Sequence, residues 1–397
     1  MIRPLRTDEK KQALDLSAYA FQFSLSESEE QEILKDMDER HVRVRENDEG
    51  GIAAKLSILP LRASIAGVDM AMGGIAGVAT WPEYRRGGHV SALLVDAFEA
   101  MREAGQTISF LYPFSIPFYR KFGYELFARE LEVTMTREQF PEAAETAATL
   151  VRIEPDKSYE ALSGLYHDWA SAFTGTLKRD QDWWDKRLLK RKKGSIIAAK
   201  QGGRLTGYMM YSVKDRTMTV KEMVWTDADS RRALFTFIRN HDSMADRCVI
   251  TVPPDSHLPY LLPDPKALQD VKSYFMMRIV DVEGFFAHFP FQTADKAVTI
   301  PLHITDDHCP WNNGTFLLAV KDGSVSVSKI PEKQGSRCAH PPKKGIHLAI
   351  NSLAAIMAGV MSTSFLNAEG IVSGDEASIH AFDGLIPVQR PFIYDFF

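Results

Sequence analysis

The fold is decided by residues 74–124, GIAGVATWPEYRRGGHVSALLVDAFEAMREAGQTISFLYPFSIPFYRKFGY. Its first seven residues are small and apolar without any charge, which predicts a strand buried in a sheet and ended by Pro82. From Gly88 to Met101, apolar residues recur at helical spacing, and Gly105 follows as an expected left-handed cap. A strand at 107–112 and a short helix begun by Ser115 complete the order strand, turn, helix, strand, helix.

The turn between the first strand and the helix is basic and rich in glycine, Tyr84-Arg85-Arg86-Gly87-Gly88-His89-Val90. At the start of a helix, unpaired backbone N–H groups and the helix dipole favour an anion such as a pyrophosphate. Taken alone, such a match is more often an ordinary loop. The Rossmann fingerprint is excluded, because its first pair of glycines is absent here.

Two motifs in this segment resemble the acyl-CoA core of the GCN5-related N-acetyltransferases (GNAT). The family turn, Arg/Gln-x-x-Gly-x-Gly/Ala, is matched by Arg85 and Gly88, whereas Val90 is larger than the usual last residue. The second family motif, Phe-Tyr-x-Lys-x-Gly-Phe/Tyr, is matched by the segment 118–124, FYRKFGY. The resemblance implies that acetyl-CoA binds here as a co-substrate and that Tyr119 acts on the thioester.

Length and composition indicate a multi-domain enzyme. The chain has 397 residues, 45% of them hydrophobic and 25% charged, with a net charge of −5, which argues against a dedicated nucleic-acid binder. The three cysteines are far apart in the sequence, so we expect a reducing compartment, no structural zinc and no other metal. The charged start and the lack of a long apolar run predict a cytoplasmic protein that does not bind membranes.

Three domains are expected: residues 1–147, 148–291 and 292–397. The first contains two amphipathic helices capped by Thr7 and by Ser26 or Ser28, then strands near 51–59, 64–72 and 74–80. The second repeats the order of strands, helix and strand without the phosphate turn, which predicts a degenerate copy that binds no cofactor. The third alternates three strands (298–305, 314–321, 324–329) with helices near 349–358 and 376–382, as a small α+β layer.

The whole chain resembles the Eis-like (enhanced intracellular survival) acetyltransferases. That family has two tandem GNAT-like acetyltransferase folds, the second degenerate, followed by a sterol-carrier-protein-like α+β domain. The turn at 306–314, DDHCPWNNG, and the end Tyr394-Asp395-Phe396-Phe397 carry the likeness outside the first domain. The resemblance also implies a homo-oligomer, with a hexamer as the expected assembly, and amine substrates such as aminoglycoside-like polyamines or lysine.

The resemblance assigns two catalytic groups, the hydroxyl of Tyr119 as general acid and the terminal carboxylate of Phe397 as general base. An ordinary phenol keeps its proton at neutral pH, whereas a carboxylate needs burial to become a useful base. The cofactor contacts are expected along the strand, the turn and the start of the short helix: Val78, Ala79, Thr80, Arg85, Arg86, Gly87, Gly88, His89, Val90, Ser91, Phe114 and Ser115.

The sequence offers candidate residues for binding the acceptor amine. A polyamine substrate predicts acidic and aromatic groups at the mouth of the site, and the candidates are Phe21, Phe23, Glu27, Glu29, Glu30, Asp36, Asp38 and Asp395. For most of the acids, a solvated acidic helix face is the preferred interpretation. The basic run at 186–193, KRLLKRKK, is interpreted as a solvated helix end. A lipid or sterol carrier that senses acyl-CoA, and a structural assembly protein, stay open as alternative functions.

Overall fold

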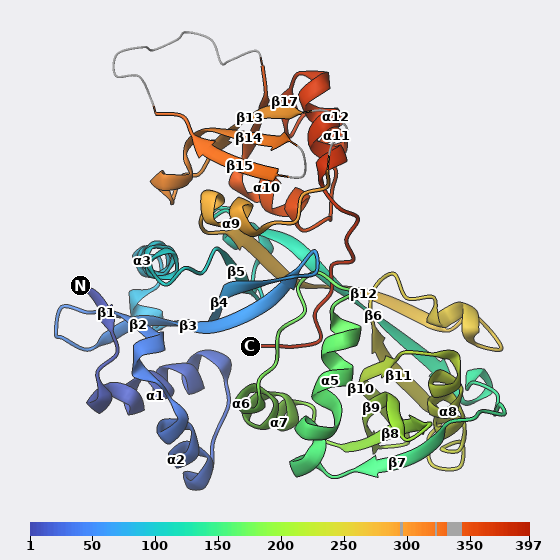
Figure 1. Ribbon diagram of the computed structural model, residues 1–397. Helices are drawn as coiled ribbons and strands as arrows, with labels where there is room; N and C mark the ends of the chain where they lie inside the picture. Colours follow the sequence, from blue (N-terminus) through green and yellow to red (C-terminus); the bar gives the residue numbers. More distant parts are fainter. Residues whose placement is uncertain (294–296, 322–323, 332–343) are drawn as a thin grey trace.

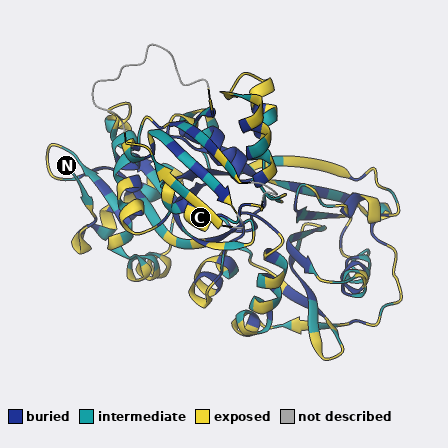
Figure 2. Ribbon diagram, turned by 45° about the horizontal axis from the view of Figure 1, so that its top comes forward, coloured by how far each residue is buried: buried dark blue, intermediate teal, exposed yellow. Residues whose placement is uncertain are grey.

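The computed structural model describes residues 1–293, 297–321, 324–331 and 344–397, and Figure 1 shows three units that follow one another along the chain. A 12-stranded sheet passes through the first two units in the order β1-β2-β3-β4-β5-β12-β6-β11-β10-β9-β8-β7. A 5-stranded sheet in the third unit has the order β15-β14-β13-β16-β17. Buried residues run along the strands and exposed residues cover the outer helices (Figure 2), as expected for layered α+β units.

The first unit contains the strands β1 (Ile2–Pro4), β2 (Val42–Glu46), β3 (Ile52–Ile65), β4 (Val68–Thr80), β5 (Ile108–Leu111) and β6 (Glu125–Thr136). Its helices are α1 (Lys10–Phe21), α2 (Glu27–Asp36), α3 (His89–Glu103) and α4 (Ile116–Arg120). The structure has two long strands where the sequence predicted three between residues 51 and 80. The chain reverses tightly between them at Ala66 and Gly67, both with positive φ. Ser26 caps α2 as expected. Thr7 does not cap α1, because it already lies inside a 3-10 turn.

The second unit contains β7 (Thr149–Ile153), β8 (Ser195–Gln201), β9 (Arg204–Lys214), β10 (Thr217–Trp225), β11 (Arg247–Val252) and β12 (Leu268–Ile279). Its helices are α5 (Ser158–Ala170), α6 (Gln181–Trp183), a π-helical turn (Trp184–Leu188), α7 (Leu189–Arg191) and α8 (Ala228–Arg239). The hairpin β9-β10, helix α8 and parallel strand β11 repeat the order of β3-β4, α3 and β5. The expected second copy of the fold is therefore confirmed.

The third unit contains β13 (Val298–Thr305), β14 (Gly314–Lys321), β15 (Ser324–Lys329), β16 (Ile346–Ala349) and β17 (Ser373–Gly374). Its helices are α9 (Val282–His288), α10 (Ile350–Met357), α11 (Thr363–Ala368) and α12 (Glu376–Leu385). The sequence did not predict β16, β17 or α11, which are too short to show a period of their own. Among the described residues, no helix is long and apolar enough to cross a membrane.

The end of the chain returns from the third unit to the first two (Figure 1). Phe392, Ile393 and Tyr394 are buried there, and Phe392 donates its backbone N–H to the carbonyl of Thr174. The segment around Thr174 is itself bonded to β3, because Gly175 N–H donates to the carbonyl of Ser64 over 2.7 Å. Parts of the chain that are far apart in sequence thus meet beside the first unit's sheet.

Candidate active site

One edge of β4 is open where the thioester arm is expected. β4 pairs in parallel with β5 only from Met72 to Ile75, and β5 ends at Leu111 while β4 continues to Thr80. A bulge at Gly77, whose φ is 58°, shifts the register against β3 at this point. The predicted residues 78–80 therefore lie on a strand edge that β5 does not cover. The Thr80 hydroxyl is buried without a hydrogen-bond partner, so a polar group of a ligand can satisfy it.

The turn before α3 has the geometry of an anion site. Arg86 and Gly88 both have positive φ, 66° and 74°, and Gly88 is the N-cap of α3 without a side-chain cap. The first bond back into the turn runs from Ala92 N–H to the carbonyl of Gly88. The amides of the preceding residues, up to Ser91, are therefore the unsatisfied donors of a helix start. Residues 85–88 are exposed, so these donors are open to solvent.

His89 has a local role in this turn. A side chain at Gly87 would place its Cβ 2.8 Å from His89 Nε2, so only glycine lets the imidazole fold back there. The ring meets Tyr84 edge-on at 6.2 Å, and its Nδ1 is buried without a partner. Val90 packs against the apolar cluster under α3. The turn thus offers backbone donors and basic side chains to an anionic ligand.

Tyr119 lies on the α3 side of the sheet. Ser115 caps α4 by accepting the Phe118 N–H, which fixes the first turn. Tyr119 is 2% exposed and packs near the rings of Phe114 and Tyr124, at 5.2 and 5.9 Å. Burial raises the pKa of its hydroxyl well above the ordinary value, so the group keeps its proton at neutral pH. Phe114, in contrast, is 69% exposed at the rim.

Phe397 lies on the opposite face of β4. A Cβ built on Gly74 would come within 2.8 Å of the Phe397 ring, whereas one on Gly73 would meet Met101 of α3. The ring also meets Phe275 at 4.9 Å and Trp183 at 6.0 Å. The Phe397 ring thus lies at Gly74 on one face of β4, while Ile75 on the other face belongs to the apolar cluster that contains Tyr119.

Asp395 holds this tail in place. Its carboxylate accepts hydrogen bonds from Arg179 Nε at 2.9 Å and Trp183 Nε1 at 2.8 Å, and it is 2% exposed. Arg179 continues to Glu222 with two bonds of 2.8 Å, and Lys192 also bonds that carboxylate. The prediction that Asp395 faces a substrate at the mouth of the site is therefore wrong, because its oxygens serve a buried ion network.

This network also fixes the charge states. Burial alone would raise the pKa of Glu222, but Arg179 and Lys192 outweigh it and hold that pKa far below the ordinary value. Asp395 and Glu222 raise the pKa of the Arg179 guanidinium above its usual value, although burial acts in the opposite direction. Sequence reasoning missed Arg179 and Glu222. The available signal was a glutamate inside the apolar strand 217–225, which calls for a buried cationic partner.

The basic run at 186–193 is not simply solvated, contrary to the prediction. The Lys192 side chain is 8% exposed against Glu222, and the Arg191 guanidinium stacks 3.4 Å above the Phe396 ring. Lys190 crosses to Glu32 of α2 at 2.6 Å. The run therefore joins the second unit to the tail and to the first unit. Phe21 and Phe23, at and just after the end of α1, are exposed.

Lys55 is a buried charged residue near the bulge of β4 that the sequence analysis did not identify. It is 4% exposed on β3, and a Cβ on Gly77 would lie 3.5 Å from its Nζ. Burial lowers the pKa of this amine to about 8. The available signal was a lone lysine in the apolar run 52–56, IAAKL.

The third unit docks onto the Tyr119 segment. Arg278 is fully buried and donates to Asp306 at 2.6 Å and to the carbonyl of Phe122. His308 Nε2 is 2.9 Å from the carbonyl of Lys121, and its ring stacks on Phe122 at 4.7 Å. The turn 306–314 therefore supports the end of the motif 118–124.

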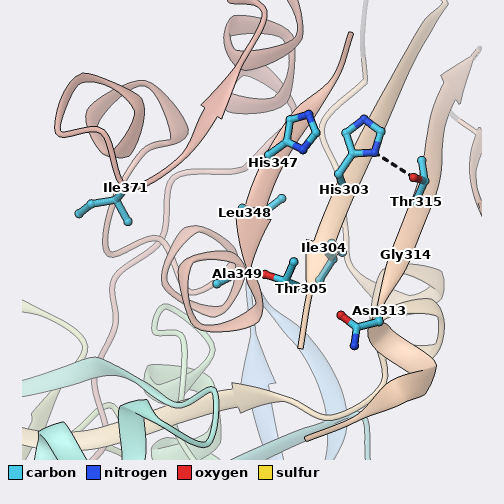
Figure 3. A pocket seen from close by; sticks show the side chains of 10 residues that line it. All are labelled: His303, Ile304, Thr305, Asn313, Gly314, Thr315, His347, Leu348, Ala349 and Ile371. Carbon is cyan, nitrogen blue, oxygen red and sulfur yellow. Dashed lines mark hydrogen bonds between the residues drawn. The ribbon is translucent and has the colours of Figure 1, made fainter. Parts of the chain in front are cut away.

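A hollow on the third unit lies apart from these residues. Figure 3 shows that it follows β13, β14 and β16 and that polar side chains line much of it. The rings of His303 and His347 stack at 4.2 Å, and His303 Nδ1 is 2.8 Å from the Thr315 hydroxyl. Both polar and apolar side chains line this hollow, so it does not by itself indicate the wide apolar cavity that a lipid or sterol carrier requires.

Comparison with protein families agrees with the three units. Residues 1–127 match an acetyltransferase (GNAT) domain, residues 175–279 match another acetyltransferase (GNAT) domain, and residues 282–394 match a sterol carrier protein domain. N-acetyltransferase Eis of Mycobacterium tuberculosis (strain ATCC 25177 / H37Ra) is 25% identical over 285 residues, 67% of this chain and 68% of that protein. An uncharacterized N-acetyltransferase of Streptomyces griseus is 23% identical over 322 residues, 74% of each chain.

Solved structures share the complete fold. A probable N-acyltransferase of Enterococcus faecalis V583 superposes with a TM-score of 0.91 at 24% identity, over 100% of this chain and 99% of that one. Eis1 from Mycobacterium abscessus gives 0.80 at 20% identity, over 100% of both chains. These likenesses show the fold, while the curated relatives and domain families give the activity class. The chain is therefore an N-acetyltransferase with two GNAT domains followed by a sterol-carrier-like domain, and it is similar to the Eis N-acetyltransferases over about two thirds of its length.

Proposed function

We propose that this acetyltransferase moves the acetyl group of acetyl-CoA onto a primary amine at the open edge of β4. One observation supports the proposal: Tyr119 belongs to the apolar cluster that includes Ile75 of β4, and the Phe397 ring lies against the neighbouring Gly74 on the other face of the sheet. An acyl transfer needs a proton donor for the leaving sulfur and a proton acceptor for the attacking amine. Two groups on opposite sides of the reacting carbon can fill those two roles.

The residues present fit acetyl-CoA. The amides from Arg86 to Ser91 would hold the pyrophosphate, with Arg85 and Arg86 adding positive charge. The backbone of residues 78–80 would pair with the peptide-like pantetheine arm, since β5 leaves that edge free. Phe114 and Ser115 would line the thioester end, where α4 begins. Acetyl-CoA supplies the activated acyl group when bound.

The chain's own groups then handle the protons. Tyr119 holds its proton at neutral pH and would release it toward the sulfur side. The terminal carboxylate of Phe397 would take a proton from the amine on the other face. The rings of Phe275 and Trp183 lie against the Phe397 ring, and a terminal carboxylate that such rings shield from water would be a stronger base. Primary amines such as polyamines and lysine are the acceptors that the family resemblance implies.

The test is a free-thiol release assay with acetyl-CoA and a panel of aminoglycosides, polyamines and lysine peptides. Tyr119→Phe is expected to lower kcat by about 10²-fold or more, since general acid catalysis contributes that much, with unchanged acetyl-CoA affinity by calorimetry. Tyr260→Phe is the matched control, because Tyr260 is 81% exposed. Equal kcat in Tyr119→Phe would remove that residue as the acid. No heat with acetyl-CoA would reject the site.

A further inference from the structure

Lys55 lies on the face of the sheet that α1 covers. Its neighbours Ala54 and Leu56 pack with α3 on the other face, so the side chain of Lys55 points away from α3. Across the sheet, Lys55 pairs with Val44 of β2 and Ala79 of β4, and both belong to the apolar cluster that α1 completes. The lysine therefore lies beside apolar groups and is only 4% exposed.

The amine of Lys55 ends at the bulge of β4. A Cβ on Gly77 would lie 3.5 Å from Lys55 Nζ and 3.8 Å from the Ser57 hydroxyl. Among the described residues, the amine has no partner for a hydrogen bond or an ion pair, and burial alone shifts its pKa. It is nevertheless not one of the fully enclosed unpaired polar atoms of the described chain. The nitrogen is thus unpaired and keeps some access to a group that lies against Gly77.

The proposed path of acetyl-CoA brings the thioester toward this amine. The pyrophosphate would lie at the turn before α3, and the pantetheine arm would pair with residues 78–80. An arm that begins at the turn passes Thr80 first and Val78 last, so its thioester end comes next to Gly77. Strand β5 does not cover this position, because its pairing with β4 ends at Ile75.

The protonation state of Lys55 also suits attack on a thioester. The neutral form of an amine is the nucleophile, and burial lowers the pKa of Lys55 from 10.5 to about 8. About one such amine in ten is neutral at pH 7, against roughly one in three thousand for an ordinary lysine. An amine held close to the acyl carbon gains further from proximity.

We propose that Lys55 is itself an acetyl acceptor, so that the enzyme acetylates its own chain at this residue. The inference rests on the proposed acetyl transfer and adds an internal acceptor to it. Lys55 Nζ would attack the acetyl carbon of bound acetyl-CoA, so that a C–N bond forms and the C–S bond breaks. The sulfur leaves as the CoA thiol with a proton from Tyr119. The proton that the amine loses passes to the carboxylate of Phe397 or to water, and solvent returns a proton to Tyr119.

The product of this step is an amide, which does not donate its acetyl group as a thioester does. Acetyl-lysine should therefore accumulate to one group per chain and not turn over. The modification also removes a positive charge that has no counter-charge among the described residues, and the burial of such a charge is unfavourable.

The test is mass spectrometry of the full chain incubated with acetyl-CoA and no added amine. Peptide mapping before and after incubation should show acetylation at Lys55 that approaches one group per chain. The reaction should be at least about tenfold faster than at the exposed Lys200 and Lys266. The rate at Lys55 should rise with pH and level off above about pH 8. Labelling of exposed lysines with no excess at Lys55, before or after incubation, would overturn the inference.

Variants show whether the enzyme catalyses this step. Tyr119→Phe should slow acetylation of Lys55 about 10²-fold and leave that of Lys200 unchanged, whereas the exposed Tyr260→Phe should behave as wild type. Lys55→Arg keeps a cation at this position and should remove the acetyl group from the intact mass. An unchanged rate at Lys55 in Tyr119→Phe would mean uncatalysed acylation and would overturn the proposal. The wild-type peptide map decides the matter even where Lys55→Arg fails to fold.

The outcomes also separate this inference from the proposed function. Transfer to added amines while Lys55 stays unmodified would overturn the inference and leave the acetyltransferase proposal standing. Acetylation of Lys55 without turnover of any amine in the panel would support the inference and reject the proposed external acceptors. No heat with acetyl-CoA and no acetyl group on Lys55 would reject both.

Discussion

Removal of the Asp395 carboxylate is the sharpest test of how the tail is held. Asp395→Ala deletes the acceptor of Arg179 Nε and Trp183 Nε1 while leaving Phe396 and Phe397 in the chain. The side chains of Arg179, Lys192, Glu222 and Asp395 carry two positive and two negative charges. The variant leaves one buried positive charge uncompensated, so the tail loses its main polar anchor.

The size of the effect follows from burial. Breaking a buried ion pair by removing one partner costs about 3–5 kcal/mol, and each 1.4 kcal/mol is about tenfold in an equilibrium constant. Docking of the tail should therefore weaken by roughly two to four powers of ten. Turnover should fall toward that of a chain without its tail. Acetyl-CoA binding should persist, because the phosphate turn lies in another part of the first unit.

The assay combines three measurements: thiol release at saturating acetyl-CoA, calorimetry with acetyl-CoA, and the rate at which carboxypeptidase removes the terminal residues. The matched control is Asp255→Ala, which breaks the tail's exposed ion pair between Arg390 and Asp255. An exposed pair is worth about 0–1 kcal/mol, so the control should behave as wild type. Full turnover and protease resistance in Asp395→Ala would refute the reasoning.

Three further predictions concern the same face of the sheet. A short extension after Phe397, or its deletion, should cut turnover far more than acetyl-CoA affinity; a C-terminally tagged enzyme of equal rate would contradict the assigned base. Gly74→Ala should displace the Phe397 ring, which lies 2.8 Å from the new Cβ, and lower kcat about tenfold or more; an unchanged rate by the thiol assay would show that the ring is not held there. Lys55→Met should stabilise the fold by up to about 3 kcal/mol at pH 7, because burial lowers the folded-state pKa from 10.5 to about 8. Below pH 8 the Lys55 amine is charged in both the folded and the unfolded protein, so the folded protein bears the full cost of burying that charge. The free energy of unfolding of the wild type should therefore rise between pH 8 and 10.5. The same rise in Lys55→Met, measured by urea unfolding, would contradict this.

The first unit was predictable because its signals are local. The uncharged strand 74–80, the glycine turn and the stripe from Val90 to Met101 each specify one element, and the structure has them in that order. Ser115 and Gly105 were correctly identified as a helix cap and a left-handed residue. The division of residues 51–80 into three strands failed because a tight turn at Ala66-Gly67 carries no strong signal and Pro60 does not interrupt β3.

The acceptor side was not predictable from local patterns, because its charges are paired over long distances in the chain. Asp395 meets Arg179 across 216 residues, and Arg179 meets Glu222 across 43. Each of these side chains, viewed alone, has the composition of a solvated surface. Only the packing of the tail against both GNAT domains shows which acids are already neutralised and which cations are not.

That distinction bears on the chemistry of the site. In water, an unpaired charged group is solvated and has little influence on the charge of the ligand that binds beside it. In a site that excludes water, an unpaired charge favours a ligand of the opposite charge. The ion pair between Asp395 and Arg179 is complete within the chain, so it stabilises the tail and leaves no charge to offer a substrate. Lys55 has no such partner among the described residues, so burial of its charged amine lowers the stability of the fold unless a bound ligand offsets that cost.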